Sequence, residues 1–434
     1  MRIARAIPAV LLSAAAGFAS AQSQIPAVFV ANNGNLEGSV TSYTFDPDGR
    51  PVVVDQFITD SRNPGEPTKG GENAYSIDIS PSGEFLAVTH VTALSPFERL
   101  TILRVHPDAT LSEEARYQVP NAAFSVKWLS DTRLAVTRTS TSFPNYLFTY
   151  EWDRPNNRLR QLGLVQLDSF STVKAIHPSR QWLYVNTTVL FQGGSLQTVF
   201  IDPGTGVPTI IDTMPLGPNY GLDPAISSDG RLLYVAGGSI NDEIAGFLVD
   251  ETSGLLFPAG FGFFQTPDRS PNQIGFGPDD GVIYVGHANG KIRSFLVDPT
   301  SGEIVDTGLT FDIGDVGDIQ PFGEDLVLML NKNDLNSPDM GLISMTYDPT
   351  GSFAGITGPA VPSGGRAPER MATWFVEAPA CPADLNGDGV VDADDFFLFL
   401  QLFADGDLRA DFNNDGVIDA DDFFAYLGAF ADGC

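Results

Sequence analysis

The chain has 434 residues, of which 43% are hydrophobic, so it is long and apolar enough to bury one large core and a smaller second one. Its formal net charge of −30 argues against a nucleic-acid partner, because phosphate binding requires a basic surface. The same charge suits cation binding and solubility outside the cell.

The first 21 residues have the pattern of a secretory signal peptide. Two arginines open the segment, residues 9–16 form an apolar run, and Ala-Ser-Ala at 19–21 gives the small-x-small cleavage pattern. We therefore expect the mature chain to begin at Gln22 and to be exported, whether secreted, held at the cell surface or kept in the periplasm. A retained N-terminal anchor is the alternative. No second hydrophobic span follows in the sequence, so we expect no transmembrane span in the mature chain.

Residues 22–377 repeat a unit of roughly 45–51 residues, a period typical of propellers and solenoids. The clearest copies lie at 225–257 and 274–304. In each copy, apolar residues alternate with polar ones and are interrupted every few residues by Gly, Pro, Asp or Ser. This pattern indicates short antiparallel strands joined by turns. We find no long helical pattern before residue 394.

The repeats also predict the number of blades. Six full copies begin near residues 73, 121, 169, 219, 270 and 315. A seventh copy is split, because 28–57 supplies outer strands without a leading strand and 368–376 is a leading strand with little after it. We expect the C-terminal strand to complete the first blade, since a closed ring leaves no long bare sheet edge. The sequence thus predicts an all-β, seven-bladed β-propeller, with six or eight blades as the alternative.

Four segments of this region resemble the lactonase-type, or YVTN-repeat, propellers. They are LYVAGG at 233–238, IYVGHANG at 283–290, VDPTSGEI at 297–304 and GGRAPERM at 364–371. The resemblance covers nearly all of residues 26–377, and the group includes bacterial hydrolases of sugar-phosphate lactones and cycloisomerases of the muconate type. Such motifs specify strands and turns better than they specify chemistry, so the resemblance implies the fold first and lactone chemistry second.

A propeller normally works at the mouth of its central channel where the innermost strands begin. The residues just ahead of the predicted inner strands are polar, namely Asn73, Ser171, Asn219, Asn272, Asp315, Glu369 and Arg370. We take Asn73, Asn219, Asn272 and Arg366 as candidates for binding a substrate. The alternative is that these residues only cap turns and satisfy backbone groups.

Lactone hydrolysis needs a base that activates water and a cation or donor that stabilises the oxyanion. Arg370 and Arg366 are the best oxyanion candidates, and Asp315 or Glu369 is the candidate base. His287 ends a predicted strand from which a loop reaches the mouth, which makes it a further catalytic candidate. The sequence contains no HExxH, GxSxG or P-loop motif, so each of these residues has a packing or surface role as its alternative.

The last 54 residues form an acidic module between the chain's two cysteines, Cys381 and Cys434. This stretch holds thirteen aspartates and one arginine, with no Glu or Lys, for a net charge of −12. In an oxidising compartment the cysteines are expected to pair and tie the ends of the module together, which by chain entropy contributes about 4 kcal/mol. Two unpaired thiols are the alternative.

Two loops in this module, 384–395 and 411–422, match the calcium loop of an EF-hand. That loop takes oxygen ligands from positions 1, 3, 5, 7, 9 and 12, with Gly at position 6. The predicted ligands of two calcium ions are Asp384, Asn386, Asp388, Val390, Asp392, Asp395, Asp411, Asn413, Asp415, Val417, Asp419 and Asp422. Neither loop contains the His or Cys that zinc or copper prefers. A solvated, disordered tail is the alternative.

Each loop is followed by a short apolar helix, and two such helices are suited to pack about a pseudo-two-fold axis. The duplicated loops, with Asp at position 12, resemble the type I dockerin module over about residues 381–434, including the cysteine borders. This implies a small α-helical, EF-hand-like calcium module at 378–434 and a cohesin-like or cell-surface docking partner. In dockerins loop positions 10 and 11 contact the partner, and here they are Ala393, Asp394, Ala420 and Asp421. Many dockerins carry hydroxyl residues there, so the partner need not be a cellulosome cohesin.

These patterns leave two hypotheses for the propeller. Because no catalytic motif is evident, the first is an exported, non-catalytic platform that binds a ligand or saccharide and is anchored or assembled through its calcium-dependent tail. The alternative is a lactonase-like hydrolase that acts on a sugar-derived or aromatic lactone.

Overall fold

The computed structural model describes residues 24–34, 37–61, 73–91, 99–120, 123–140, 144–189, 193–217, 222–238, 242–332, 341–377, 382–386, 390–413 and 416–432. The chain divides into two compact units, a propeller over Ile25–Val376 and a helical tail from Glu377 onward. The predicted signal peptide, residues 1–21, lies outside the described residues.

The described part of the propeller is built from 27 strands and one short 3-10 helix, η1 (Arg154–Asn156). The first fifteen strands are β1 (Gln24–Asn32), β2 (Glu37–Phe45), β3 (Pro51–Ser61), β4 (Ala74–Ile79), β5 (Phe85–His90), β6 (Arg99–Val105), β7 (Leu111–Gln118), β8 (Ala123–Ser130), β9 (Arg133–Arg138), β10 (Asn145–Asp153), β11 (Arg158–Leu167), β12 (Phe170–Ile176), β13 (Trp182–Val189), β14 (Gly193–Ile201) and β15 (Pro208–Pro215). The others are β16 (Leu222–Ile226), β17 (Leu232–Ala236), β18 (Glu243–Val249), β19 (Leu256–Gln265), β20 (Pro271–Phe276), β21 (Val282–His287), β22 (Lys291–Val297), β23 (Ile304–Asp312), β24 (Val316–Phe322), β25 (Leu326–Asn331), β26 (Gly341–Thr346) and β27 (Pro368–Glu377).

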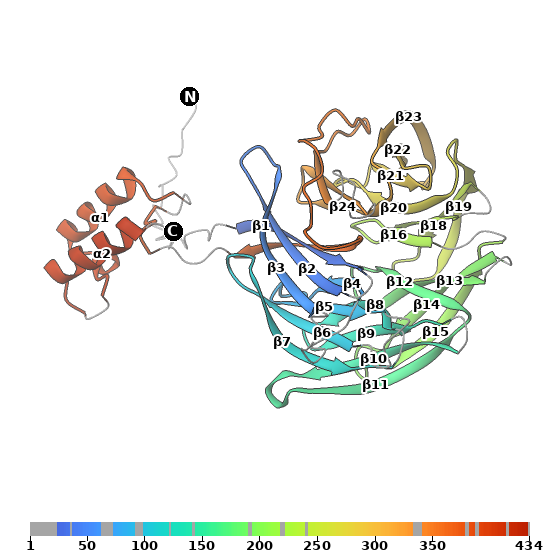
Figure 1. Cartoon of the computed structure of the whole chain (residues 1–434), viewed down its shortest axis with the longest axis horizontal. Coiled ribbons are helices and arrows are strands. Elements are labelled where there is room, and N and C mark those ends of the chain that lie inside the picture. The colour runs from blue at the N-terminus through green and yellow to red at the C-terminus, as the bar shows by residue number, and fades with distance from the viewer. Residues whose placement is uncertain are drawn as a thin grey trace, which may run out of the picture. The chain divides into compact units, whose positions relative to one another are not determined.

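These strands form seven sheets, one for each blade. Six sheets have four strands, and the sheet of β24, β25 and β26 has three in the described part of the chain. Beyond β26 the chain returns along that blade through two isolated bridges, Leu342 with Val361 and Met345 with Ile356. The inner strands β4, β8, β12, β16, β20 and β24 gather around the centre of the ring (Figure 1). The prediction of a seven-bladed propeller is confirmed.

The first blade is closed by both ends of the propeller, as the split repeat predicts. Its strand order is β27-β1-β2-β3, so the last strand of the unit is the innermost strand of the first blade. The other inner strands begin within three residues of the predicted starts. Because β1 pairs with β27 on one side and with β2 on the other, the first blade has no exposed inner edge where the two ends of the propeller meet.

The LYV motif of the repeats builds the contacts between neighbouring blades. Its tyrosines in β13 and β17, Tyr184 and Tyr234, are completely buried. The Tyr184 hydroxyl donates to the carbonyl of Gly254 at 3.1 Å, and the Tyr234 hydroxyl donates to that of Gly302 at 2.8 Å, in each case in a turn of the next blade. Both glycines have φ near +70°, which L side chains rarely adopt. The motif therefore joins one blade to the next.

The tail contains two helices, α1 (Ala393–Asp405) and α2 (Ala420–Asp432), and a short 3-10 helix, η2 (Leu408–Ala410). Phe399 and Tyr426 occupy equivalent positions of the two repeats, and their rings stack with centroids 4.1 Å apart and an interplanar angle of 1°. Stacking between equivalent residues is the contact expected at a pseudo-two-fold axis. In the described part of the chain, no helix is long and apolar enough to cross a membrane.

Candidate functional site

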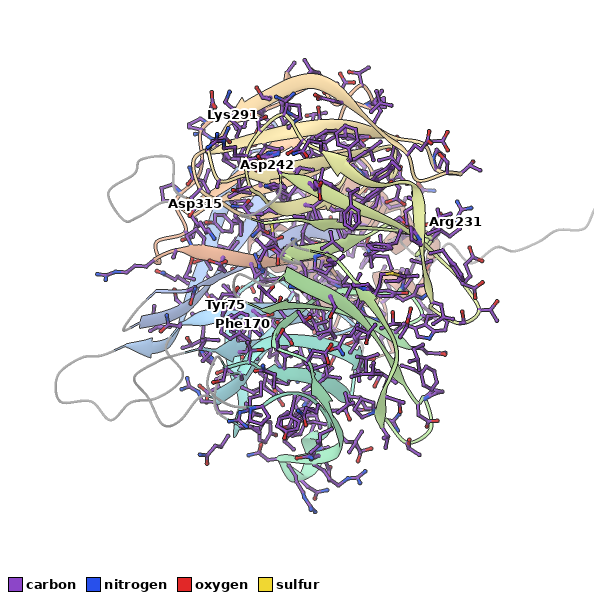
Figure 2. All side chains as sticks on the ribbon, turned by 90° about the vertical axis from the view of Figure 1, so that its right-hand side faces the viewer. Tyr75, Phe170, Arg231, Asp242, Lys291 and Asp315 are labelled. Carbon is purple, nitrogen blue, oxygen red and sulfur yellow. The ribbon has the colours of Figure 1, made fainter. Side chains whose placement is uncertain are left out.

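The central channel holds a small cavity of about 20 Å³, roughly the room that one water molecule needs, beside the first halves of the inner strands. It is lined by Tyr75, Ser76, Ile77, Ser125, Lys127, Thr172, Val173, Lys174, Asp223, Asp318, Gln320, Arg370 and Met371. Tyr75 and Phe170, from the starts of β4 and β12, lie toward one end of the ring in Figure 2, whereas Arg231, in the turn after β16, lies toward the other. The cavity is thus nearer the mouth at which the inner strands begin.

Three charged residues reach this cavity from β-bulges. The pairing register shifts across Lys174 in β12, across Asp223 in β16 and across Asp318 in β24. Asp223 also has φ of +31°, an unusual value for a residue with a side chain. A bulge inserts a residue into one strand and re-aims its side chain, and both bulges and strained backbone recur at functional sites.

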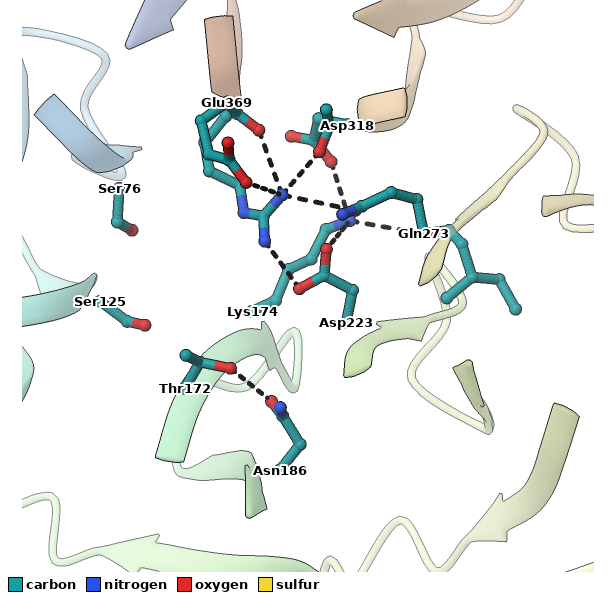
Figure 3. Close-up of polar contacts among 12 residues, drawn as sticks. Ser76, Ser125, Thr172, Lys174, Asn186, Asp223, Gln273, Asp318 and Glu369 are labelled. Atoms are coloured by element: carbon teal, nitrogen blue, oxygen red, sulfur yellow. Dashed lines mark hydrogen bonds and ion pairs between the residues drawn. The ribbon is translucent and has the colours of Figure 1, made fainter. Parts of the chain in front are cut away.

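Arg370, at the start of β27, forms the centre of the charged cluster. Its Nη2 donates to Asp223 Oδ1 at 2.8 Å, and its Nη1 donates to the carbonyl of Gly317 at 2.6 Å (Figure 3). Nη1 also lies 3.4 Å from Gln273 Oε1 and 3.8 Å from a carboxylate oxygen of Glu369. Only 9% of Arg370 is exposed, so the guanidinium is fixed in place by buried acceptors.

The second buried pair joins Lys174 to Asp318. Lys174 Nζ lies 2.8 Å from Asp318 Oδ1 and 3.8 Å from Asp223 Oδ2, so it stands between the two carboxylates. Asp318 Oδ2 also accepts the backbone N–H of Met371 at 3.1 Å. Burial raises the pKa of Asp318, but the charges of Lys174 and Arg370 outweigh burial and hold that pKa below its usual value. Asp318 is therefore an ionised structural partner.

Asp223 differs from Asp318 in having one oxygen that is not engaged. Arg370 binds its Oδ1, whereas its buried Oδ2 has no hydrogen-bond partner among the described residues and only the distant Lys174 ammonium nearby. The side chain lines the cavity and is 5% exposed. A carboxylate oxygen held in orientation and free to accept a proton is what a general base requires.

The structure brings together two of the four catalytic residues predicted from sequence. Glu369 and Arg370 are adjacent on β27 and buried, and Glu369 also pairs with Lys332 at 3.4 Å. Asp315 lies just before β24 and is exposed, and its backbone carbonyl accepts the N–H of Lys332. His287 ends β21 with no exposed surface and does not line the cavity, and burial lowers its pKa.

The predicted substrate-binding residues are not gathered at the cavity. Asn73, with φ of +54°, offers its carbonyl to the N–H of Val91 in a turn. Asn272 occupies the bulge of β20, and Arg366 is exposed before β27. None of these three lines the cavity in the described part of the chain, and Asn219 lies outside the described residues. Their proposed role in binding remains a prediction.

Sequence reasoning missed Lys174, Asp223 and Asp318. A charged residue inside a short apolar strand is the available signal, in "VKAI" at 173–176, "LDPAI" at 222–226 and "GDIQP" at 317–321. Side chains of a regular strand alternate between the two faces of its sheet, so the sequence assigns each residue to one face. A bulge interrupts this alternation and moves the residue's side chain, and the alternation rule does not predict bulges.

A second, larger cavity, of about 310 Å³, lies beside the second halves of the inner strands. It shares Lys127, Lys174 and Gln320 with the first cavity, and most of its other lining residues are apolar. The channel is therefore polar and charged near the strand starts and mainly apolar toward the strand ends. Of these two cavities, the first has room for about one water molecule, whereas the second has room for a substrate ring and reaches Lys174.

The predicted calcium loops of the tail are described in part. The position-12 carboxylates Asp395 and Asp422 are buried, and each accepts backbone N–H groups from loop positions 2, 3 and 9 at 2.7–3.0 Å. Gly416, at position 6, has φ of +86° and donates its N–H to Asp411 at 2.9 Å. In its described part, the second loop thus turns at Gly416 as a calcium loop does at position 6.

Several parts of the tail prediction fall beyond what is described. Asp388 and Asp415, Gly389, and both cysteines, Cys381 and Cys434, lie outside the described residues. Within the described residues, no group of three or more His, Cys, Asp or Glu side chains is gathered as a metal site. The calcium ions and the disulfide therefore remain predictions.

Replacing Lys174 by methionine is expected to destabilise the propeller by about 3–5 kcal/mol at pH 7, because the substitution leaves the buried Asp318 carboxylate without its nearest cation. Since the folded pKa of Asp318 lies below its ordinary value, the wild-type pair stabilises the fold above that value and loses its effect as pH falls through the folded pKa. In the variant that pKa rises, so at pH 4 the carboxyl of Asp318 is protonated and the loss of stability relative to the wild type should be smaller.

Urea unfolding at pH 7 and pH 4 measures the free energy of unfolding of both proteins. Lys291→Met, outside the channel, is the control. An equal loss at both pH values would exclude this electrostatic origin.

No family model and no curated protein matches the chain. Solved structures do match it. The periplasmic gluconolactonase PpgL of Pseudomonas aeruginosa aligns with a TM-score of 0.62 at 16% identity, over 81% of this chain and 99% of that one. A putative 6-phosphogluconolactonase from Bacteroides uniformis aligns with a TM-score of 0.63 at 13% identity, over 81% and 100%. Sqt1 of Saccharomyces cerevisiae aligns with a TM-score of 0.51 at 14% identity, over 81% and 91%. At these identities the likeness shows the propeller fold, with lactonases among its structural neighbours.

Proposed function

We propose that the propeller is a hydrolase that opens a lactone ring in its central channel, with Asp223 as the general base. The observation that carries this proposal is the asymmetry of the Asp223 carboxylate. Arg370 holds one oxygen, and the other, without a hydrogen-bond partner among the described residues, belongs to a side chain that lines the cavity beside Lys174. The likeness in fold to a gluconolactonase and to a putative 6-phosphogluconolactonase supports the same function.

Asp223, Lys174 and Arg370 have different roles in the proposed hydrolysis. Asp223 Oδ2 takes a proton from water as the water oxygen attacks the lactone carbonyl. The Lys174 ammonium, which has Asp318 as its close carboxylate partner, donates a hydrogen bond to the oxygen that becomes negative. The ring C–O bond then breaks, and the proton on Asp223 passes to the departing alkoxide, which yields a hydroxy acid. Arg370 is a positioning residue, because it acts through Asp223.

The test is proton release in a pH-stat by the full mature chain, supplied with a panel of sugar and aromatic lactones. Turnover above the spontaneous rate is expected. Arg370→Ala should lose it, because Asp223 then loses its fixed orientation, whereas His287→Gln should keep it, because His287 does not line the cavity. Each variant is checked for folding by circular dichroism. Absence of turnover on every lactone would refute the hydrolase and favour the non-catalytic binding platform.

For the tail, we propose two bound calcium ions and a docking role for an exported protein. The four residues predicted to contact a partner, Ala393, Asp394, Ala420 and Asp421, are all exposed. Beside them, Phe397 and Phe424 occupy equivalent positions of α1 and α2 and are 64% and 66% exposed. Two matching aromatic residues on the surface support a partner-binding role.

A further inference from the structure

We infer that the substrate is an uncharged lactone with an apolar ring, which binds in the second cavity and enters from the mouth at which the inner strands end. This inference rests on the proposed function and deepens it, because it names the substrate class and the side of entry. It is carried by the apolar walls of the second cavity, by the pairing of its polar groups and by the place of Lys174, which lines both cavities.

The second cavity has the size and the opening that a small ligand needs. Its volume of about 310 Å³ falls at the lower end of the range of small-molecule pockets. Ser228 lines this cavity and is exposed, so the cavity reaches the surface there. Ser228 lies in the same turn as Arg231, toward the end of the ring away from Tyr75 and Phe170 (Figure 2). This mouth is opposite to the one expected from the sequence.

The walls between this mouth and the centre of the channel are apolar. They are formed by the second halves of the inner strands, with residues such as Ile176 on β12, Ala225 and Ile226 on β16, Phe276 on β20 and Ile319 on β24. Ile176, Ala225 and Ile226 are only half-buried, so they leave apolar surface that a ligand can cover. A hydroxyl group placed against such walls loses its hydrogen bonds to water and gains none in return. The walls therefore favour an apolar ring over a polyhydroxylated one.

Polar residues at both ends of the second cavity are already paired. At the rim, the Ser228 hydroxyl donates to Asp280 Oδ2 at 2.6 Å. At the inner end, Lys127 Nζ lies 2.9 Å from Asp78, and the Gln320 amide donates to two other channel residues at 2.9 and 2.8 Å. A phosphate or carboxylate on the ligand needs a cation that is not already neutralised, and burying it here would leave its charge without compensation. The ligand is therefore uncharged.

Lys174 connects the second cavity to the reacting groups. Its Nζ lies 2.8 Å from Asp318 Oδ1 and 3.8 Å from Asp223 Oδ2, and Asp223 lines the small first cavity (Figure 3). A lactone in the second cavity can accept a hydrogen bond from Lys174 at its carbonyl, while the first cavity has room for the one water molecule that Asp223 deprotonates. The substrate thus needs a polar group only at its ester.

The first experiment compares kcat/KM of the full mature chain for dihydrocoumarin, whose rings carry no hydroxyl groups, and for glucono-1,5-lactone. Both are measured in the pH-stat, and each value is divided by the spontaneous rate of the same lactone, because the two lactones differ in reactivity. We expect the quotient for dihydrocoumarin to be larger by about 100-fold, since the hydroxyl groups of the sugar lactone would face apolar walls. An equal or larger quotient for glucono-1,5-lactone would overturn the inference and leave the hydrolase standing.

A binding measurement separates the site from the reaction. The lactam hydrocarbostyril has the shape of dihydrocoumarin, but an amide closes its ring and resists hydrolysis. Titration calorimetry of the full mature chain should detect its binding. Thr373→Phe, which extends an apolar side chain into the second cavity from β27, should weaken that binding by about tenfold. Thr300→Phe, in the exposed turn after β22, is the matched control and should bind as the wild type does.

The two measurements fail in different ways. Binding of the lactam without turnover of any lactone would overturn the hydrolase and, with it, the substrate class. Turnover of dihydrocoumarin with equal binding of the lactam to the wild type and to folded Thr373→Phe would overturn the place of the site and leave the hydrolase standing.

Ala225→Phe fills the second cavity from β16 and serves if Thr373→Phe does not fold. It should raise KM for dihydrocoumarin by about tenfold and change kcat little, because the substituted side chain occupies the space of the ring and not that of the attacking water. A fall in kcat with an unchanged KM would contradict the inference.

Discussion

Replacing Asp223 by asparagine is expected to lower kcat/KM for lactone hydrolysis by about 10²–10⁴-fold, the usual contribution of a general base. The amide keeps the shape of the side chain and an oxygen for the hydrogen bond from Arg370, but it does not accept a proton at neutral pH. The fall should appear mainly in kcat, because the base acts on water in the transition state rather than on the bound substrate. Initial rates in the pH-stat across substrate concentrations measure both parameters.

Asp229→Asn is the matched control for this prediction. Asp229 also pairs with an arginine, Arg231, at 2.6 Å, but the pair lies exposed in the turn after β16 and outside the channel. The control should keep its full rate. A folded Asp223→Asn variant that keeps more than a tenth of the wild-type rate would exclude Asp223 as the base.

The sequence was enough to predict the architecture of the propeller because each blade repeats the same strand and turn residues. Seven copies of one pattern predict seven blades, and the split seventh copy predicts that β27 completes the first sheet. These features depend on alternation and turn chemistry, which are local and readable. The isolated bridges that replace a fourth strand after β26 were not predicted, because 347–367 has no strand pattern of its own.

The candidate site was only half predictable, for a physical reason. Arg370 and Glu369 were found because they stand at the start of the closing strand, where channel residues are expected. Asp223 and Lys174 lie within their strands and reach the channel because a bulge shifts the register at each. His287 was selected because it ends a strand from which a loop was expected to reach the mouth, but its side chain is fully buried at the end of β21. A position at a strand end therefore does not by itself show whether a side chain reaches the channel.

Calcium is expected to stabilise the tail strongly. Thirteen aspartates against one arginine repel one another in the apo tail, and divalent cations held by the two loops would offset that repulsion. Backbone hydrogen bonds from Asn413 and Asp419 lower the pKa of Asp422, so this position-12 carboxylate is ionised and ready to bind a cation at neutral pH. At a calcium concentration 100 times Kd, each site adds about 2.7 kcal/mol to the free energy of unfolding of the tail. Titration calorimetry of the full chain, with its cysteines oxidised, should count two ions.

The two loops supply their own internal control. Asp422→Asn should reduce the count from two ions to one, because it removes a charge from the second loop and leaves the first intact. Asp405→Asn removes an equal charge from the exposed end of α1, outside both loops, and should leave two. If repulsion alone governed the tail, both variants would weaken calcium binding equally, and any added salt would replace calcium. If calorimetry detects no calcium binding to the wild-type chain, the calcium prediction itself is wrong. The packing of the two helices would then depend on apolar contacts such as the stacked rings of Phe399 and Tyr426.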